Sequence, residues 1–317
     1  MLVSKTHATA HPPRNCVVSA DATVPAMPMT LAVLKRRKAA GETLDFKLHH
    51  EAGGHPVFGS KFCLGSVRLV DEDGKPIENS RLILSIAHVA KVDPGGEAAV
   101  AVERLLALKE RAPGMLGVRY DGAFRGKHLD ELMKAGLAVI APVHGGIKRT
   151  ALERVTCAAS SQNGGACGAV HELVTESGDV GVVDVVLDPE PKAVFQPLER
   201  IKISARADKY SHRWYVEVIL PCGHPYRIRL TNSAKDRRRR YNRAEHIRMH
   251  PPGTDEYRET YAWRNDTESS HSELDNVLYR GRMPAHTVPR QALIMLGFAV
   301  AHNAKADWYA RHRESEQ

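Results

Sequence analysis

Two aspartates in this sequence each follow a short apolar run and precede small residues. Asp21 ends the segment CVVSAD at 16–21, and Asp121 ends MLGVRYD at 115–121. Both segments are typical of buried strands, and in open α/β sheets reactive groups gather at the carboxyl ends of strands. The alternative for either residue alone is structural, because an Asp after a strand often caps a turn or a helix.

A third acidic residue, Glu268, lies in the polar stretch YAWRNDTESSHSELD at 261–275. Tyr261, Arg264 and Glu268 are three and four residues apart, a spacing that aligns side chains on one face of a helix. Asn265 is placed to be the N-cap of that helix, with Glu268 at N3 as in a capping box. The structural alternative is that Glu268 does no more than cap.

Three carboxylates held close together have a clear chemical use. Like charges raise one another's pKa, so such a cluster is costly without cations. Two divalent ions about 3.5–4 Å apart would relieve that cost. Such ions can activate a water or a 3′-hydroxyl and stabilise the leaving oxygen of a phosphodiester. Ligands that are all oxygen favour Mg²⁺ or Mn²⁺ over Zn²⁺.

The segments that must position these residues alternate between strand and helix patterns. Apolar runs predict strands at 16–21, 61–70, 81–90, 115–121 and 137–143. Helical spacing and end signals predict helices at 30–39, 95–114, 126–136, 266–280 and 291–312. DEDGKP, between the second and third strands, has the composition of a hairpin turn. The sequence therefore predicts an α/β unit, a mixed sheet flanked by helices.

From about residue 150 the pattern becomes β-rich. Strand-like segments occur at 169–174, 181–188, 199–204, 212–220 and 225–230, with no clear helix between them. We expect three parts: residues 1–150 with both aspartates, a β-rich insertion at 151–256, and C-terminal helices at 257–317 with Glu268.

The β-rich part ends in the basic run KDRRRRYNRAEHIRM at 235–249, whose net charge is +5. Arg237, Arg238, Arg239 and Arg240 are expected to contact DNA phosphates, and Tyr241 is a candidate for stacking on a base. The alternative is a solvated charged face that binds nothing.

Four possible zinc ligands fall in the same part: Cys157, Cys167, Cys222 and His224. They invite a structural zinc site, but the short Cys-x₂-Cys knuckle is absent. Unpaired cysteines in a β core are the commoner outcome, and we expect that outcome here.

Composition favours a soluble protein with an acidic partner. The chain has 317 residues, 43% hydrophobic residues, a formal net charge of +8 and five cysteines. An odd number of scattered cysteines suits a reducing compartment. The longest apolar run, at 292–301, is too short to span a bilayer, and the first residues have no apolar signal core. We expect a cytoplasmic location.

Tyr261, Arg264 and Glu268 match in type and spacing the Y-(2)-R-(3)-E-(6)-K motif of bacterial insertion-sequence DDE transposases, which the C-terminal stretch resembles. The Lys position is Asp275, a departure from the motif. VRYDGAFRGKHLDELMKAGLAVIAPV resembles the segment of the family's second Asp, and NCVVSADATVP resembles its first-Asp strand. The resemblance covers nearly the whole chain, with a β-rich insertion between the second Asp and the Glu.

This resemblance implies an RNase H-like core that cuts DNA at the ends of the element and transfers the strands into a target. Asp21, Asp121 and Glu268 would hold two Mg²⁺ or Mn²⁺ ions, and Tyr261 and Arg264 would contact phosphates near the cut. It also implies a homodimer on DNA and a place in the bacterial cytoplasm beside the nucleoid.

Two alternatives stay open. The family usually carries a DNA-binding region before the first Asp, and here twenty residues precede Asp21. One alternative is therefore a truncated, non-catalytic DNA-binding remnant. The other is an RNase H-like nuclease with a cellular role, which would cleave DNA without strand transfer.

Overall fold

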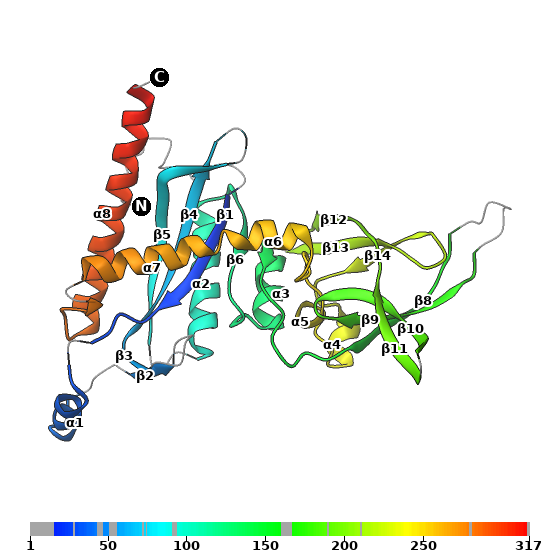
Figure 1. Ribbon diagram of the computed structural model, residues 1–317, viewed down its shortest axis with the longest axis horizontal. Helices are drawn as coiled ribbons and strands as arrows, with labels where there is room; N and C mark the ends of the chain where they lie inside the picture. The colour runs from blue at the N-terminus through cyan, green and yellow to red at the C-terminus, as the bar shows by residue number, and fades with distance from the viewer. Residues whose placement is uncertain are drawn as a thin grey trace. The chain divides into compact units, whose positions relative to one another are not determined.

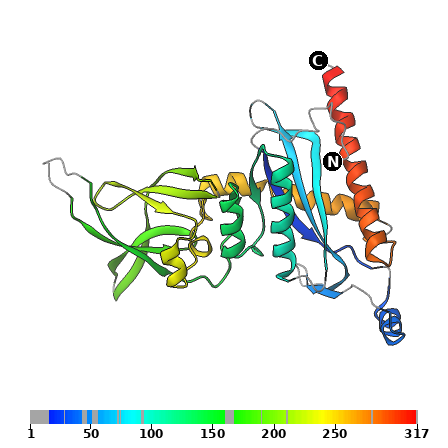
Figure 2. The same ribbon diagram turned by 180° about the vertical axis from the view of Figure 1, so that it is seen from behind.

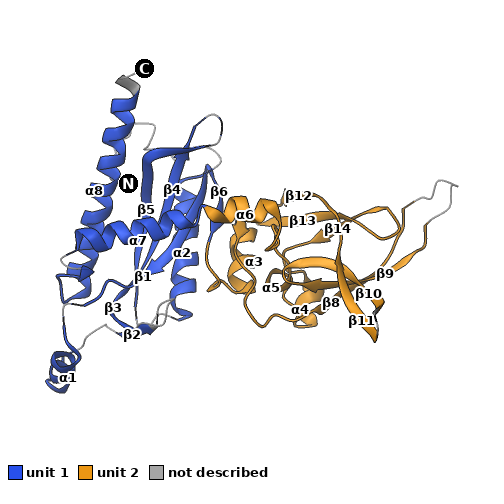
Figure 3. Ribbon diagram, in the orientation of Figure 1, with its two compact units in different colours: residues 1–119, 263–317 blue, residues 120–262 orange. Residues whose placement is uncertain are grey.

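The computed structural model divides the chain into two compact units, shown in Figure 3: unit 1 is residues 1–119 and 263–317, and unit 2 is residues 120–262. The structure describes residues 16–315 except 28, 43–46, 51–55, 72, 74, 91–93, 160–166, 189, 210 and 279–280.

The sheet of unit 1 contains four strands in the order β5-β4-β1-β6. Their bounds are β1 Cys16–Thr23, β4 Lys61–Val70, β5 Pro76–Val89 and β6 Met115–Arg119. β1 runs antiparallel to β4 and parallel to β6, so the sheet is mixed, as we predicted. A short antiparallel ribbon of β2 (Lys47–His50) and β3 (Pro56–Gly59) completes the strands described in this unit.

β1 is the strand that carries the first aspartate. Both of its faces are buried, since Val18 and Ala20 on one face and Ser19 and Asp21 on the other are all less than 9% exposed. A strand between two neighbours and under two helical layers has this pattern. Asp21 is therefore held inside the unit and is not a surface turn residue.

Helices cover both faces of this sheet. The helices of unit 1 are α1 (Leu31–Ala39), α2 (Gly96–Arg111), α7 (Asn265–Val277) and α8 (Val288–Ser315). Phe62 and Leu64 of β4 pack with Leu274 of α7 and with Met295 and Phe298 of α8 in one buried cluster. Figure 1 shows α7 crossing the front of the strands, and Figure 2, seen from the opposite side, shows α2 in front of them. The predicted α/β unit with helices against a mixed sheet is confirmed.

Unit 2 is built around two antiparallel sheets, with orders β11-β10-β9-β8 and β12-β13-β14. Its strands are β7 Ala138–Ile140, β8 Thr150–Thr156, β9 Val170–Glu176, β10 Asp179–Asp188, β11 Glu190–Pro197, β12 Arg200–Ala207, β13 His212–Ile219 and β14 Pro225–Arg229. Its helices are α3 Gly126–Lys134, α4 Ala234–Arg238, α5 Arg243–His246 and α6 Asp255–Ala262.

The boundaries of the units differ from the parts that we expected. Residues 120–150 and 257–262 belong to unit 2, whereas we placed them with the core. Contacts of α3 explain the first difference, because the indole N–H of Trp214 donates to the carbonyl of Met133 at 2.8 Å. A Cβ on Gly136 would lie 2.7 Å from the ring of His212, so the end of α3 fits closely against β13.

Among the described residues, none of the helices combines the length and the apolar character that crossing a bilayer requires.

Candidate active site

One arginine joins two of the three predicted carboxylates. The guanidinium of Arg264 donates to Oδ2 of Asp21 at 2.8 Å and to Oε1 of Glu268 at 2.9 Å. Asp21 lies on β1, opposite Leu64 of β4, and its other oxygen, Oδ1, accepts from the N–H of Ala22 at 2.9 Å. Asp21 is buried and Glu268 is largely exposed, so the arginine connects an interior carboxylate to one that faces solvent.

Glu97 supplies a further carboxylate, which the sequence analysis missed. A carboxylate oxygen of Glu97 lies within 4.8 Å of one of Asp21. Glu97 stands in the first turn of α2 and accepts from Nζ of Lys61 at 2.9 Å. An acidic residue in a first turn is usually explained by the helix dipole. The sequence signal was the acidic residue just after Gly95 and Gly96, but nothing in it indicated contact with β1.

The start of α7 differs from the predicted capping box. The N-cap is Arg264, which has helical backbone angles and makes no side-chain cap, and Asn265 is already inside the helix. α6 ends at Ala262, so only Trp263 and Arg264 separate the two helices and leave no extended residue to cap the second. Glu268 is therefore free of the predicted capping role, and its carboxylate pairs with Arg264 instead.

Asp121 and Tyr261 belong to unit 2, unlike Asp21, Arg264 and Glu268. Oδ1 of Asp121 accepts from the N–H of Ala123 at 2.9 Å, as in an Asx turn. The ring of Tyr261 stacks on that of Tyr257 with centroids 4.9 Å apart. The structure thus brings Asp21, Arg264 and Glu268 together inside one unit and places the other two residues in the second.

His271 lies one turn after Glu268 on α7 and is held neutral. Burial and, to a smaller extent, the positive charge of Arg264 lower the pKa of His271 to about 4, against an opposing effect of Glu268. Its buried Nε2 has no hydrogen-bond partner among the described residues. A neutral imidazole beside Arg264 avoids a second cation next to the carboxylates.

We expect acidification to destabilise unit 1 through His271. The unfolded chain takes up a proton near pH 6.5, whereas the folded pKa is about 4. The unfolded state therefore binds more protons between these values, so stability is full above pH 6.5 and falls as the pH drops towards 4. One pKa unit corresponds to about 1.4 kcal/mol, which sets the scale of the loss. Thermal unfolding followed by circular dichroism at pH 7.5, 6, 5 and 4.5 measures it.

The matched pair for this measurement is His271→Gln and His312→Gln. Gln at position 271 is polar and does not titrate, so this variant should lose less stability on acidification than the wild type. His312 is an exposed histidine in α8, so His312→Gln controls for the loss of a histidine as such. Equal slopes for wild type and His271→Gln would contradict the assignment.

The arginines of the basic run in unit 2 differ in their side-chain contacts. Arg239 donates to the carbonyl of Leu152 at 2.6 Å and to Oδ1 of Asp236 at 2.9 Å. Arg237, Arg238 and Arg240 are exposed, and no ion pair joins them to another described residue. Arg239 is therefore held by contacts within unit 2, although it is exposed like the other three, and the DNA contact of the four arginines stays a prediction.

Tyr241 is engaged inside unit 2 as well. Its ring stacks on His246 with centroids 4.8 Å apart, and the guanidinium of Arg239 lies 4.3 Å from its centroid. Its hydroxyl lies 3.4 Å from that of Thr175. Because these contacts already engage the ring, Tyr241 is a weaker candidate for stacking on a base than its sequence context indicated.

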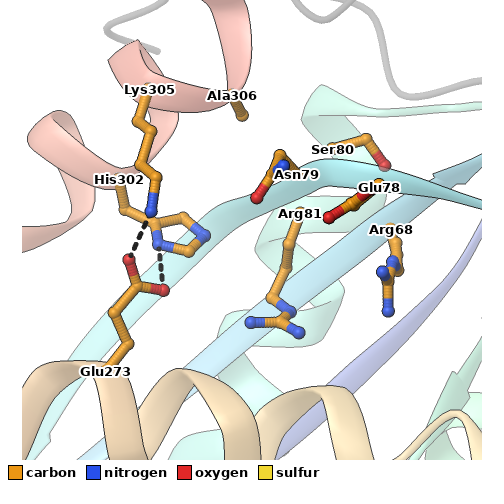
Figure 4. A pocket seen from close by; sticks show the side chains of 9 residues that line it. All are labelled: Arg68, Glu78, Asn79, Ser80, Arg81, Glu273, His302, Lys305 and Ala306. Atoms are coloured by element: carbon orange, nitrogen blue, oxygen red, sulfur yellow. Dashed lines mark ion pairs between the residues drawn. The ribbon is translucent and has the colours of Figure 1, made fainter. Parts of the chain in front are cut away.

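A polar pocket of about 250 Å³ lies elsewhere in unit 1, between β4, β5, α7 and α8 (Figure 4). Glu273 pairs there with Lys305 at 3.5 Å. Arg68 and Arg81 both bind Asp266, at 3.0 and 3.1 Å. The cations of the pocket are thus paired within the unit, which leaves Asp21, Glu97, Arg264 and Glu268 as the stronger candidate site.

The donors around Asp21 fit a hard divalent cation. Asp21, Glu97 and Glu268 offer carboxylate oxygens alone, the ligands that Mg²⁺ and Mn²⁺ prefer. Two of these carboxylates lie within 4.8 Å of each other, and a guanidinium stands beside Asp21. The site already attracts a positive group, so a metal ion is chemically suited to it. No family model, curated protein or solved structure matches this chain.

Proposed function

We propose that the chain is the catalytic core of a DDE transposase, which cleaves DNA phosphodiesters and transfers strands with two Mg²⁺ or Mn²⁺ ions. The contact that carries the proposal is Arg264 between Asp21 and Glu268. Asp21 and Arg264 are 243 residues apart in sequence. Two segments that carry the resemblance thus meet at one point of unit 1 through their side chains.

Asp121 is the third carboxylate of the proposal. β1 and β6 run parallel, and Ser19 pairs with Arg119. Asp21 and Asp121 each come two residues after this pair, so the register of the strands favours placing them at the same edge of the sheet. Because Asp121 belongs to unit 2, its joining of Asp21 is part of the proposal.

Each residue has a proposed role. Asp21, Asp121 and Glu268 hold the ions, which when bound activate the attacking hydroxyl and stabilise the leaving oxygen. Glu97 adds negative charge beside Asp21, which increases the attraction for a divalent cation. Arg264 neutralises Asp21 and Glu268 before metal binds, and its planar fork is suited to a DNA phosphate afterwards.

The mixed sheet with helices on both faces supports an RNase H-like assignment for unit 1. In that assignment the first carboxylate lies on a central strand, as Asp21 does between β4 and β6. We further propose that the protein acts as a homodimer on DNA, because pairing two element ends requires two protomers, and that it works in the bacterial cytoplasm.

The proposed DNA surface of unit 2 consists of Arg237, Arg238 and Arg240. Each phosphate neutralised by a cation contributes about 0.9 to the slope of log K against log salt. We expect Arg237→Gln/Arg238→Gln to lower the magnitude of that slope by roughly 2. Fluorescence anisotropy with a labelled duplex at 50 to 300 mM salt measures it.

The matched control for this pair is Lys192→Gln/Arg206→Gln. It removes the same charge from exposed positions on β11 and β12 of the same unit. We expect the control to keep the wild-type slope. If both pairs changed the slope equally, only net charge would matter and the surface would be wrongly placed.

A second candidate function is DNA binding without catalysis. The observation in its favour is again Arg264, since its bonds to Asp21 and Glu268 occupy oxygens that a metal would need. In this case Arg264 would be a permanent substitute for the ion. The transposase would cleave DNA when a metal ion is present, whereas the binding protein would not.

The deciding experiment incubates the purified chain with duplex DNA that contains the sequences flanking its coding region on both sides. Cleavage is followed with Mg²⁺, with Mn²⁺ and with EDTA, and joining to a labelled plasmid is followed in parallel. Cleavage and joining that need metal support the transposase. Cleavage without joining favours a nuclease, and DNA binding without cleavage favours the binding protein.

A further inference from the structure

Four metal-binding side chains gather in unit 2, away from the carboxylates. Ligand atoms of Cys157, Cys167, Cys222 and His224 all lie within 4.8 Å of one another. No disulfide links any of the described cysteines, and Cys157 is 4% exposed. Three free thiols and an imidazole at these distances differ from the scattered cysteines that the sequence led us to expect.

Backbone hydrogen bonds hold the first two ligands beside each other. The chain continues the pairing of β8 and β9, since the N–H of Cys157 donates to the carbonyl of Ala169 at 2.8 Å and the N–H of Gly168 donates to that of Cys157 at 3.0 Å. The N–H of Cys167 also donates to the carbonyl of Ala159 at 2.8 Å. The two thiols therefore extend from a fixed β ladder.

The other two ligands stand in the tight turn between β13 and β14. The N–H of Leu220 donates to the carbonyl of His224 at 2.9 Å, and the N–H of Gly223 donates to that of Leu220 at 2.8 Å. Gly223 has a φ of 80°, which a residue with a side chain rarely adopts. Leu220 and this glycine thus fix a turn whose two neighbouring side chains, Cys222 and His224, face the cysteines of the other hairpin.

A buried ring nitrogen without a hydrogen-bond partner favours a bound metal ion in this cluster. Nδ1 of His224 is buried and has no hydrogen-bond partner among the described residues. A buried polar atom without a partner costs about 1–3 kcal/mol, so most such atoms have one. A metal ion bound to Nδ1 would remove this cost. A metal ion bound to the other ring nitrogen would fix the tautomer of the imidazole, and Nδ1 could then form a hydrogen bond.

We propose that Cys157, Cys167, Cys222 and His224 form a structural Zn²⁺ site. Tetrahedral zinc with Zn–S bonds of about 2.3 Å places its sulfurs about 3.8 Å apart, within the spacing that these four side chains already have. Three thiolates and an imidazole are soft and borderline ligands, which suit zinc and not Mg²⁺. With four protein ligands the site has no open position, so its role is structural.

The zinc ion ties two separate hairpins of unit 2 together. Cys157 and Cys167 come from the sheet β11-β10-β9-β8, while Cys222 and His224 come from the sheet β12-β13-β14. A bond network through one ion would fix the two sheets to each other, since zinc binding adds directly to folding free energy. This inference is independent of the proposed catalytic site.

The test uses the full chain, purified without chelator. Inductively coupled plasma mass spectrometry should find one zinc per chain in the wild type and in Cys16→Ala, a buried cysteine of unit 1. Cys222→Ser and His224→Gln should retain less than a fifth of it. Because a variant can fail to fold, the wild type is also stripped and titrated with Co²⁺, whose visible absorption reports tetrahedral thiolate binding.

Saturation of the cobalt spectrum at one ion per chain, with displacement by zinc, is the expected result. A folded wild type that carries no zinc and gives no such spectrum overturns the proposal. A disulfide among these cysteines under reducing conditions, found by mass spectrometry after alkylation, also overturns it, because an oxidised pair cannot bind the ion.

Discussion

Asp21→Asn and Glu268→Gln are each expected to lower metal-dependent DNA cleavage by at least about 100-fold. Loss of a residue that only supports a metal ligand typically costs 10- to 100-fold in affinity or activity, so loss of a ligand itself should cost no less. Both substitutions keep the size of the side chain and remove its negative charge. Initial rates of cleavage at saturating Mg²⁺ and at saturating Mn²⁺ measure the effect.

The two variants should differ in stability although they agree in activity. Asp21 is buried, and Asp21→Asn removes the charge that pairs with the largely buried guanidinium of Arg264 at 2.8 Å. Replacing Glu268 affects an exposed ion pair, worth about 0–1 kcal/mol. We therefore expect Asp21→Asn to lower the melting temperature, and Glu268→Gln to leave it nearly unchanged.

Glu273→Gln is the control for this prediction. It makes the same chemical change on the same helix, at a residue paired with Lys305 and His302 in the pocket of Figure 4. Cleavage should stay within about twofold of the wild type. If Glu273→Gln lost as much activity as Glu268→Gln, the loss would come from α7 as a whole, and the catalytic assignment of Glu268 would fail.

Much of unit 1 could be predicted because its patterns are simple. β4 matches its predicted bounds of 61–70, and α1 and α2 lie within one to three residues of theirs. Long apolar runs with clear turn residues leave few alternatives, since one register buries them. The meeting of Asp21, Arg264 and Glu268 could be predicted only through the resemblance, because nothing local relates β1 to the start of α7.

The strands that were missed have identifiable causes. In β8 the buried residues are Leu152 and Val155, three apart, because a bulge between Ala151 and Glu153 breaks the alternation of the strand. β11 carries two prolines and is almost fully exposed, so its sequence has no apolar face from which a strand could be predicted. Its pairing with β10 alone makes it a strand. These are tertiary effects that a local pattern does not contain.

The site was incomplete in the sequence for the same reason. Glu97 reaches Asp21 because α2 packs against the sheet next to Lys61, and this requires the fold. The nearness of the four possible zinc ligands was not predicted either, since the spacing from Cys157 to Cys167 fits no common zinc motif. A metal motif in sequence consists of local pairs, whereas these four side chains come from two hairpins.

Asp236→Ala is expected to destabilise unit 2 by about 3–5 kcal/mol. Asp236 is fully buried and its Oδ2 accepts from Nε of Arg243 at 2.7 Å and from the N–H of Ser233 at 2.9 Å. Burial alone would raise its pKa, but the hydrogen bonds from Ser233 and Arg243 lower the pKa to about 2. Removing the carboxylate leaves the buried Arg243 without one of its partners. An incompletely paired buried charge is the main energetic cost of breaking such a pair.

Loss of Asp236 should affect DNA binding as well as stability. Asp236 lies in α4, the helix that carries Arg237 and Arg238, so its loss should weaken DNA binding as well as stability. Its stability contribution is complete above pH 3.8 and is lost as the pH falls towards 2. Urea unfolding at pH 7 in a Trp263→Phe/Trp308→Phe background, where the fluorescence comes from Trp214 of unit 2, measures the change in the free energy of unfolding.

Two further variants decide whether the effect comes from an uncompensated buried charge. Asp208→Ala breaks an exposed pair with Arg213 in the same unit and should cost about 0–1 kcal/mol. Asp236→Ala/Arg243→Met removes the stranded cation and should recover part of the loss, because an apolar side chain is cheaper to bury than an unpaired charge. If the double variant were no more stable than Asp236→Ala, the stranded cation would not be the cause. Arg243 would then be held mainly by Glu153, at 3.1 Å, and Asp236 would act through its bonds to Ser233 and Arg239.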